Sequence, residues 1–206
     1  VYAIAKLDAA FPNYFSYSDI DILCFDMGAV SKCILKVANR YVEKGFMVRA
    51  ESDVVSGKAK IDIYSPEDEE RLDFRFDIIT RLPEYRKVMI KPHYLYSILE
   101  GRAGITRQYD GHSYTLYVPS AVDDLVLRYL EYIEWYEIRP DKVKHLEYLV
   151  GKLSTEPESG AFIDKLHLYT QLLPLEIPAG SHFEAVTIRG SIAVAPEPAL
   201  SEERTS

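Results

Sequence analysis

The most regular hydrophobic pattern in the chain is an alternation of polar and apolar residues near its N-terminus. Asp19 and Asp21 alternate with three apolar residues, Ile20, Ile22 and Cys24. Successive side chains of a β-strand point to opposite faces, so the two carboxylates share one face and the apolar side chains share the other. The pattern therefore predicts a strand with one face in a hydrophobic core and one acidic face.

Similar patterns predict an α/β-type core around this acidic strand. A helix over 27–44 is predicted by apolar residues three and four positions apart, namely Val30, Cys33, Ile34, Val37 and Tyr41. Alternating or β-branched sequence predicts further strands at 1–6, 46–51, 58–64 and 72–79. One helix followed by three strands indicates a mixed sheet rather than a doubly wound parallel one.

The second half of the chain is predicted to be mainly helical. A short helix at 92–100 and a hairpin that turns at Asp110-Gly111 come first. Helices are then expected at 121–138, 141–152 and 160–173, and a short strand within 185–194. We therefore expect an α+β protein with an α/β-type core at 1–118, a helical subdomain at 119–173 and a linker or tail at 174–206.

Composition and charge narrow the possible partners. The 206 residues carry a net charge of −8, which argues against a long nucleic-acid partner because phosphate neutralisation needs clustered Lys and Arg. No apolar run reaches the ~18–20 residues of a membrane span, and no secretory pattern is seen. Cys24 and Cys33 are expected to be buried free thiols, which favours a reducing, cytoplasmic compartment. Because the sequence starts directly in a predicted strand, we expect it to be a domain of a larger protein.

The paired carboxylates have a chemical interpretation. Two like charges on one strand face repel each other, and they are costly if they are buried without a partner. A divalent cation between them removes this cost, and Mg²⁺ commonly binds one or two carboxylates together with substrate phosphates. Asp19 and Asp21 are therefore candidate ligands of Mg²⁺ or Mn²⁺. The alternative is that they lie solvated at a strand end.

Residues 18–23 read Ser-Asp-Ile-Asp-Ile-Leu, which resembles the S-D-[IL]-D-[LIV]-[LIV] motif of the nucleotidyltransferase superfamily, the polymerase-beta-like fold. The resemblance implies that three carboxylates bind two Mg²⁺ ions and that a nucleoside monophosphate passes from a nucleoside triphosphate to a hydroxyl group. The acidic charge of the chain favours a small-molecule or sugar-phosphate acceptor. Asp19 and Asp21 match the paired acids of the motif.

The third acid is expected on a neighbouring strand, where Asp62, Asp73 and Asp77 are candidates. Asp73 and Asp77 are four positions apart and share a strand face, so alternation does not separate them. We favour Asp77 because Phe74, Phe76 and Ile78 flank it with apolar bulk that holds it rigidly. Asp62 is the second choice.

A further resemblance lies in the second half. The pair Asp123-Asp124 and the segment 139–146 (RPDKVKHL) look like the helical part of nucleotidyltransferase-like proteins found in bacterial surface-polysaccharide gene sets. This resemblance implies a role in polysaccharide biosynthesis and a nucleotide-phosphate contact from the start of that helix. The candidate nucleotide-binding residues are Lys6, Ser18, Arg139, Lys142 and His145, with Lys144 beside them.

One departure from the family pattern bears on function. The family carries a Gly-Ser pair about ten residues before the first Asp, and here that spacing falls on Leu7-Asp8. Either Lys6, Arg86 and Lys87 compensate, or the chain binds a different group, or it retains the fold without catalysis. The alternatives to an enzyme are therefore a non-catalytic module of a larger glycan-assembly protein, or an RNA-modifying toxin or antitoxin of the same fold. The acidic charge disfavours the last.

Overall fold

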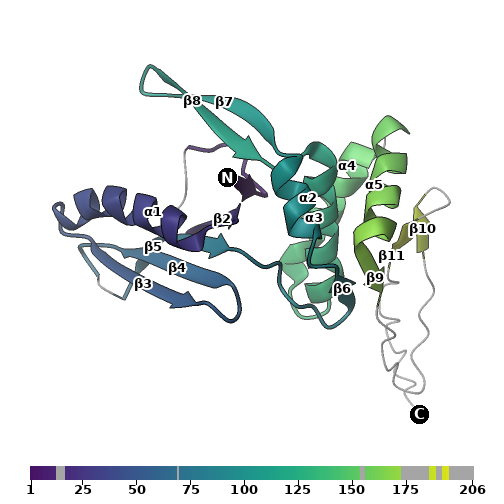
Figure 1. Cartoon of the computed structure of the whole chain (residues 1–206), viewed down its shortest axis with the longest axis horizontal. Helices are drawn as coiled ribbons and strands as arrows, with labels where there is room; N and C mark the ends of the chain where they lie inside the picture. The colour runs from purple at the N-terminus through teal and green to yellow at the C-terminus, as the bar shows by residue number, and fades with distance from the viewer. Residues whose placement is uncertain (13–16, 69, 154–155, 173–185, 189–191, 195–206) are drawn as a thin grey trace, which may run out of the picture.

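A five-stranded mixed sheet forms the first half of the protein, in the order β1-β2-β5-β4-β3 (Figure 1). The structure is a computed structural model that describes residues 1–12, 17–68, 70–153, 156–172, 186–188 and 192–194. β2 and β5 run parallel, and the other neighbouring pairs are antiparallel. The strands are β1 (Tyr2–Ala5), β2 (Ser18–Cys24), β3 (Met47–Asp53), β4 (Lys58–Tyr64) and β5 (Leu72–Ile79). The α+β class and the mixed sheet are thus confirmed.

One face of this sheet is covered by α1 (Met27–Val42) (Figure 1). The helix begins after Asp26, whose side chain accepts a hydrogen bond of 2.9 Å from the backbone N–H of Ala29, a common N-cap. Beneath the helix lies a small apolar core formed by Cys24, Ala59, Ile61 and Ile78. The apolar face of β2 therefore points into a core, as its alternation predicts.

The stripe by which α1 contacts the sheet is shifted from the predicted one. Met27, Val30, Ile34 and Leu35 pack against the core, whereas Cys33 is exposed. The expectation of a buried Cys33 thiol is therefore wrong, while Cys24 is buried as expected. The difference arises because a helix on a sheet buries only a narrow stripe, and position 33 falls at the edge of it.

The other sheet face meets the helical half, whose central element is α3 (Ala121–Trp135). The partners of α3 are α4 (Val143–Leu153) and α5 (Glu156–Tyr169), and the 3₁₀ turn η1 (Pro140–Lys142) leads into α4. The apolar residues of α3 share one core with α2 (Tyr94–Glu100). The same core contains Ala3, Ala5 and Leu23 from β1 and β2, so the two halves share a hydrophobic interior.

Small two-stranded sheets complete the described residues. The hairpin of β7 (Ala103–Tyr109) and β8 (His112–Val118) projects from the fold (Figure 1) and turns at Asp110-Gly111, as predicted. β6 (Val88–Ile90) pairs with β9 (Thr170–Leu172), so the helix predicted at 160–173 ends before 170 and its last residues form a strand. β10 (Val186–Ile188) and β11 (Ile192–Val194) are the described parts of the predicted tail, most of which lies outside the described residues. Among the described helices, none has the length and apolar character needed to cross a membrane.

Candidate functional site

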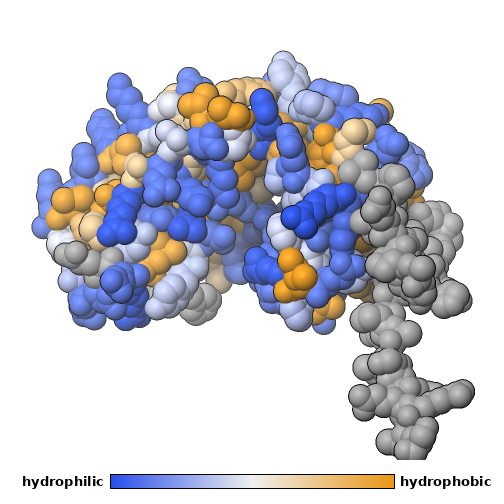
Figure 2. All heavy atoms as spheres, turned by 90° about the horizontal axis from the view of Figure 1, so that it is seen from below, coloured by the Kyte–Doolittle hydropathy of each residue, from blue (hydrophilic) through white to orange (hydrophobic). Residues whose placement is uncertain are grey.

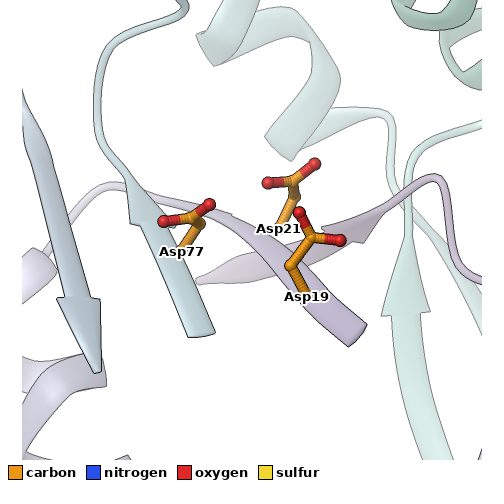
Figure 3. A group of neighbouring side chains, drawn as sticks. All are labelled: Asp19, Asp21 and Asp77. Carbon is orange, nitrogen blue, oxygen red and sulfur yellow. The ribbon is translucent and has the colours of Figure 1, made fainter. Parts of the chain in front are cut away.

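Three aspartates converge on the sheet face opposite α1. In the parallel pairing of β2 with β5, Asp21 lies directly beside Asp77, and Asp19 precedes Asp21 on the same face of β2. One carboxylate oxygen from each residue lies within 4.8 Å of the others. Figure 3 shows the three side chains projecting from β2 and β5 to the same side. We call Asp19, Asp21 and Asp77 the acidic cluster.

Asp77 is the buried member of the acidic cluster, with an exposed fraction of 7%. Burial raises the pKa of its carboxyl group, while Lys58 opposes the shift from 3.4 Å and Asp21 adds to it. Its Oδ1 atom has no hydrogen-bond partner within the described part of the chain. A buried acceptor without a donor is costly, and a cation beside it would remove that cost. Three carboxylates in this arrangement suit Mg²⁺ or Mn²⁺.

The other two candidates for the third acid lie elsewhere. Asp62 is opposite Arg75 in the β4–β5 pairing and forms a bidentate ion pair with it, at 2.6 and 2.7 Å. This hydrogen-bonded partner lowers the pKa of Asp62. Asp73 lies one residue before Phe74, where the pairing of β2 with β5 starts, and it lines an apolar groove beside α1. The strand register therefore brings Asp77, and neither Asp62 nor Asp73, to Asp21.

Lys6 links the acidic cluster to the helical half. Its Nζ lies 2.7 Å from Oδ2 of Asp21 and 2.7 Å from Oε2 of Glu131 on α3. Burial opposes the charged form, but Asp21 and Glu131 outweigh it and raise the pKa of Lys6 above its usual value. Lys6 has a φ of 51°, and this left-handed turn ends β1 beside the site. The predicted nucleotide-binding residue is thus engaged by two carboxylates.

Glu131 is a site residue that sequence reasoning missed. Its carboxylate accepts from Lys6 and, at 2.5 Å, from Lys142, and the Nε2 atom of His145 lies 3.5 Å away. Burial opposes the shift, but the two lysines hold the pKa of Glu131 at about 2. The sequence signal that could have identified Glu131 is a carboxylate within the largely apolar segment 125–133. That pattern does not identify its partners, which are Lys6 after β1, Lys142 of η1 and His145 of α4.

His145 is almost entirely buried, with an exposed fraction of 5%. Burial lowers its pKa to about 4, although Glu131 acts in the opposite direction. Neither ring nitrogen has a hydrogen-bond partner within the described residues. The ring is therefore neutral near pH 7, with nitrogen atoms available to a ligand in the space beside it.

That space is a cleft of about 490 Å³ between the sheet and the helical half. One wall carries Lys6, Leu7, Asp8, Ser18, Asp19 and Asp21, and the facing wall carries Arg128, Glu131, Lys142, Lys144, His145 and Tyr148. Asp77 lies behind Asp21 and is not part of the lining. Figure 2 shows the molecule hollowed between its two lobes, with mostly hydrophilic residues around the hollow.

The remaining predicted binding residues occupy different positions. Lys142 and His145 line the cleft, whereas Arg139 lies outside the lining and forms an exposed ion pair of 2.9 Å with Asp141. Lys87 pairs with Glu137 at 2.9 Å, also away from the cleft lining. Arg86 is likewise not among the residues that line it. Of the three cations expected to compensate for the missing Gly-Ser pair, the structure places Lys6 at the cleft.

The site combines the acidic cluster, the adjoining cleft and a facing wall that carries several cationic side chains. A divalent cation held by the cluster would face a ligand in the cleft, and Lys144 is exposed there with no ion pair in the described part of the chain. Such a site can bind an anionic ligand together with a metal ion. Comparisons with family models, with curated proteins and with solved structures find no match to this chain.

Proposed function

We propose that this protein is a metal-dependent nucleotidyltransferase, which transfers a nucleoside monophosphate from a nucleoside triphosphate to a small-molecule or sugar-phosphate acceptor. The observation that carries the proposal is the convergence of Asp19, Asp21 and Asp77, with a buried and unpartnered Oδ1 on Asp77 among the described residues, at one side of a cleft. The resemblance of residues 18–23 to the nucleotidyltransferase motif supports the same interpretation. A role in surface-polysaccharide synthesis is part of this proposal.

The proposed roles follow from position. Asp19, Asp21 and Asp77 would hold the metal ion, which would supply charge stabilisation for the phosphoryl transfer. Lys144 and His145 on the facing wall contact the phosphates of the nucleotide. In the transfer, the acceptor oxygen bonds to the α-phosphorus and the bond to the bridging oxygen breaks. Pyrophosphate leaves, and the hydroxyl proton passes to solvent.

Calorimetry tests this proposal directly. We expect at least one of the common nucleoside triphosphates to bind in the presence of Mg²⁺, and not in its absence. Asp19→Asn and Asp77→Asn should each weaken binding at least tenfold, because each removes a charged ligand. Asp62→Asn is the matched control, since Asp62 lies on the neighbouring strand but pairs with Arg75. Equal losses in the Asp62 and Asp77 variants, or no heat with any nucleotide, would refute the proposal.

One observation favours a second candidate, a non-catalytic module of a glycan-assembly protein. Leu7 and Asp8 line the cleft at the spacing where the family carries Gly-Ser, and Asp8 adds a negative charge there. This module would bind nucleotide and metal without releasing pyrophosphate in the presence of sugar-phosphate acceptors. Pyrophosphate release from the wild type that is lost in Asp19→Asn would exclude it.

A further inference from the structure

Lys6 places its ammonium group beside the acidic cluster. Antiparallel pairing sets Ala5 opposite Asp21, so the next residue, Lys6, reaches back over the acidic face. Its Nζ contacts Asp21 and Glu131 at 2.7 Å each, close enough for direct charge-assisted hydrogen bonds. The side chain has an exposed fraction of 25%. The ammonium group is therefore held between two carboxylates rather than extended into solvent.

The charges around the cluster nearly balance without any metal ion. Four carboxylates lie at or next to the cluster, those of Asp19, Asp21, Asp77 and Glu131. Three ammonium groups contact them, those of Lys6, Lys58 and Lys142. One divalent cation therefore suffices to overcompensate the remaining negative charge. A second would have to bind beside the ammonium group of Lys6 and compete with it for Asp21, which is electrostatically unfavourable.

We propose that the Lys6 ammonium group is a permanent internal cation that takes the place of a second metal ion, so that the acidic cluster binds one divalent ion per chain. The inference rests on the proposed function, because it assumes that the cluster binds metal. It departs from the two-ion site that the resemblance implies. In this site Lys6 is a positioning residue, which holds Asp21 and Glu131 at a fixed separation and supplies positive charge on the side of Asp21 next to α3.

Binding stoichiometry tests the inference without any measurement of activity. Metal-free protein is titrated with Mn²⁺, and free Mn²⁺ is counted by electron paramagnetic resonance. We expect the wild type to bind one ion per chain. Lys6→Met leaves Asp21 and Glu131 without their shared cation, so it should bind a second ion, whereas Lys6→Arg keeps the charge and should bind one. Lys6→Gln serves as a second neutral variant if Lys6→Met does not fold.

Lys87→Met is the matched control, because it removes a lysine that pairs with Glu137 away from the cleft. It should bind one ion, like the wild type, and circular dichroism should show every variant folded. Two ions in the wild type, or a folded neutral variant at position 6 that still binds one, would overturn the inference. If neither neutral variant folds, one ion in both the wild type and Lys6→Arg supports it. A wild type that binds no Mn²⁺ would instead refute the proposed function.

Discussion

His145 and Asp77 are buried with polar atoms that lack hydrogen-bond partners in the described residues, and both lie in or beside the cleft. Asp123 and Glu134 are also buried, but each is fully engaged. Asp123 accepts from the hydroxyls of Tyr94 and Ser120 and from Lys165, and Glu134 accepts from two backbone N–H groups. Buried polar groups are normally satisfied, and among the described residues that are buried as a whole, Asp77 and His145 are the exceptions, which supports the proposed ligand site.

The buried neutral ring of His145 predicts a specific pH dependence of stability. Its pKa is about 4 in the folded protein, below the ordinary value of 6.5 that applies to the unfolded chain, so the unfolded chain takes up the proton first. The contribution of the neutral His145 ring to the free energy of unfolding is complete above pH 6.5 and is lost as the pH falls toward 4. In urea unfolding of metal-free protein, the wild type should lose about 2 kcal/mol more than His145→Gln between pH 6.5 and 4.5.

The lower limit of that range avoids the titration of Glu131, whose pKa is about 2 and whose stabilising effect is lost only below about pH 4.5. His167→Gln is the control, because His167 is exposed on α5. That variant should follow the wild-type profile. A His145→Gln profile parallel to the wild type would contradict a buried neutral imidazole.

Among the elements, the sequence pattern predicts those strands and helices whose own residues alternate or follow helical spacing. The alternating sequences of β2, β4 and β5 predict strands close to their observed bounds, although only β4 alternates in burial along its whole length and β2 is buried on both faces at its end. β6 and β9 were missed, because each has three residues and they pair across a long stretch of chain. A strand this short has no period of its own, and its pairing depends on tertiary packing.

The residues of the candidate site also divide into those that a local sequence pattern predicts and those that depend on long-range packing. Apolar residues around Asp77 favoured it over Asp62 and Asp73, and the acidic cluster contains Asp77. Glu131 and Lys58 had no local pattern to distinguish them. Their positions depend on how α3 docks and on the register between β4 and β5, which are long-range properties. Sequence therefore identified the residues that one strand places, and missed those that tertiary packing places.

The two neighbouring acids at the start of α3 provide a test of what holds this element in place. Asp123 is fully buried and bonded to Tyr94, Ser120 and Lys165, so Asp123→Ala leaves a half-buried ammonium group and two hydroxyls without this partner. We expect a loss of about 3–5 kcal/mol in the free energy of unfolding, measured by urea denaturation. Asp124→Ala removes one ion pair within the helix, to Arg128, and should cost about 0.5 kcal/mol. Similar losses in the two variants would contradict this assignment.

The whole molecule is held together by a core that extends across the predicted boundary at residue 118. Ala3, Ala5 and Leu23 from the sheet pack with Leu125 and Leu130 of α3. A second, smaller core lies beneath α1 on the other face of the sheet. Because the larger core contains residues from both halves, the sheet and the helices depend on each other for burial of apolar surface.

We therefore expect one cooperative unfolding transition by calorimetry, with equal calorimetric and van't Hoff enthalpies. A fragment of residues 1–118 exposes the apolar residues of β1 and β2 and should not show a cooperative transition. A fragment of residues 1–173 retains both cores and should unfold with a midpoint within a few degrees of the full chain. A stable, cooperatively folded 1–118 fragment would show that the halves are independent domains.

The parallel pairing of β2 with β5 has a consequence for folding order. Its two strands are separated in the chain by α1, β3 and β4. By contrast, β3 pairs with β4 and β4 pairs with β5, which are neighbours in the chain. Long-range pairing loses more chain entropy than a local hairpin, so β3, β4 and β5 are expected to assemble before β2 joins them. Asp21 and Asp77 repel each other and would meet in that last step. We therefore expect the acidic cluster to be completed late in folding, after the surrounding strands can impose its geometry.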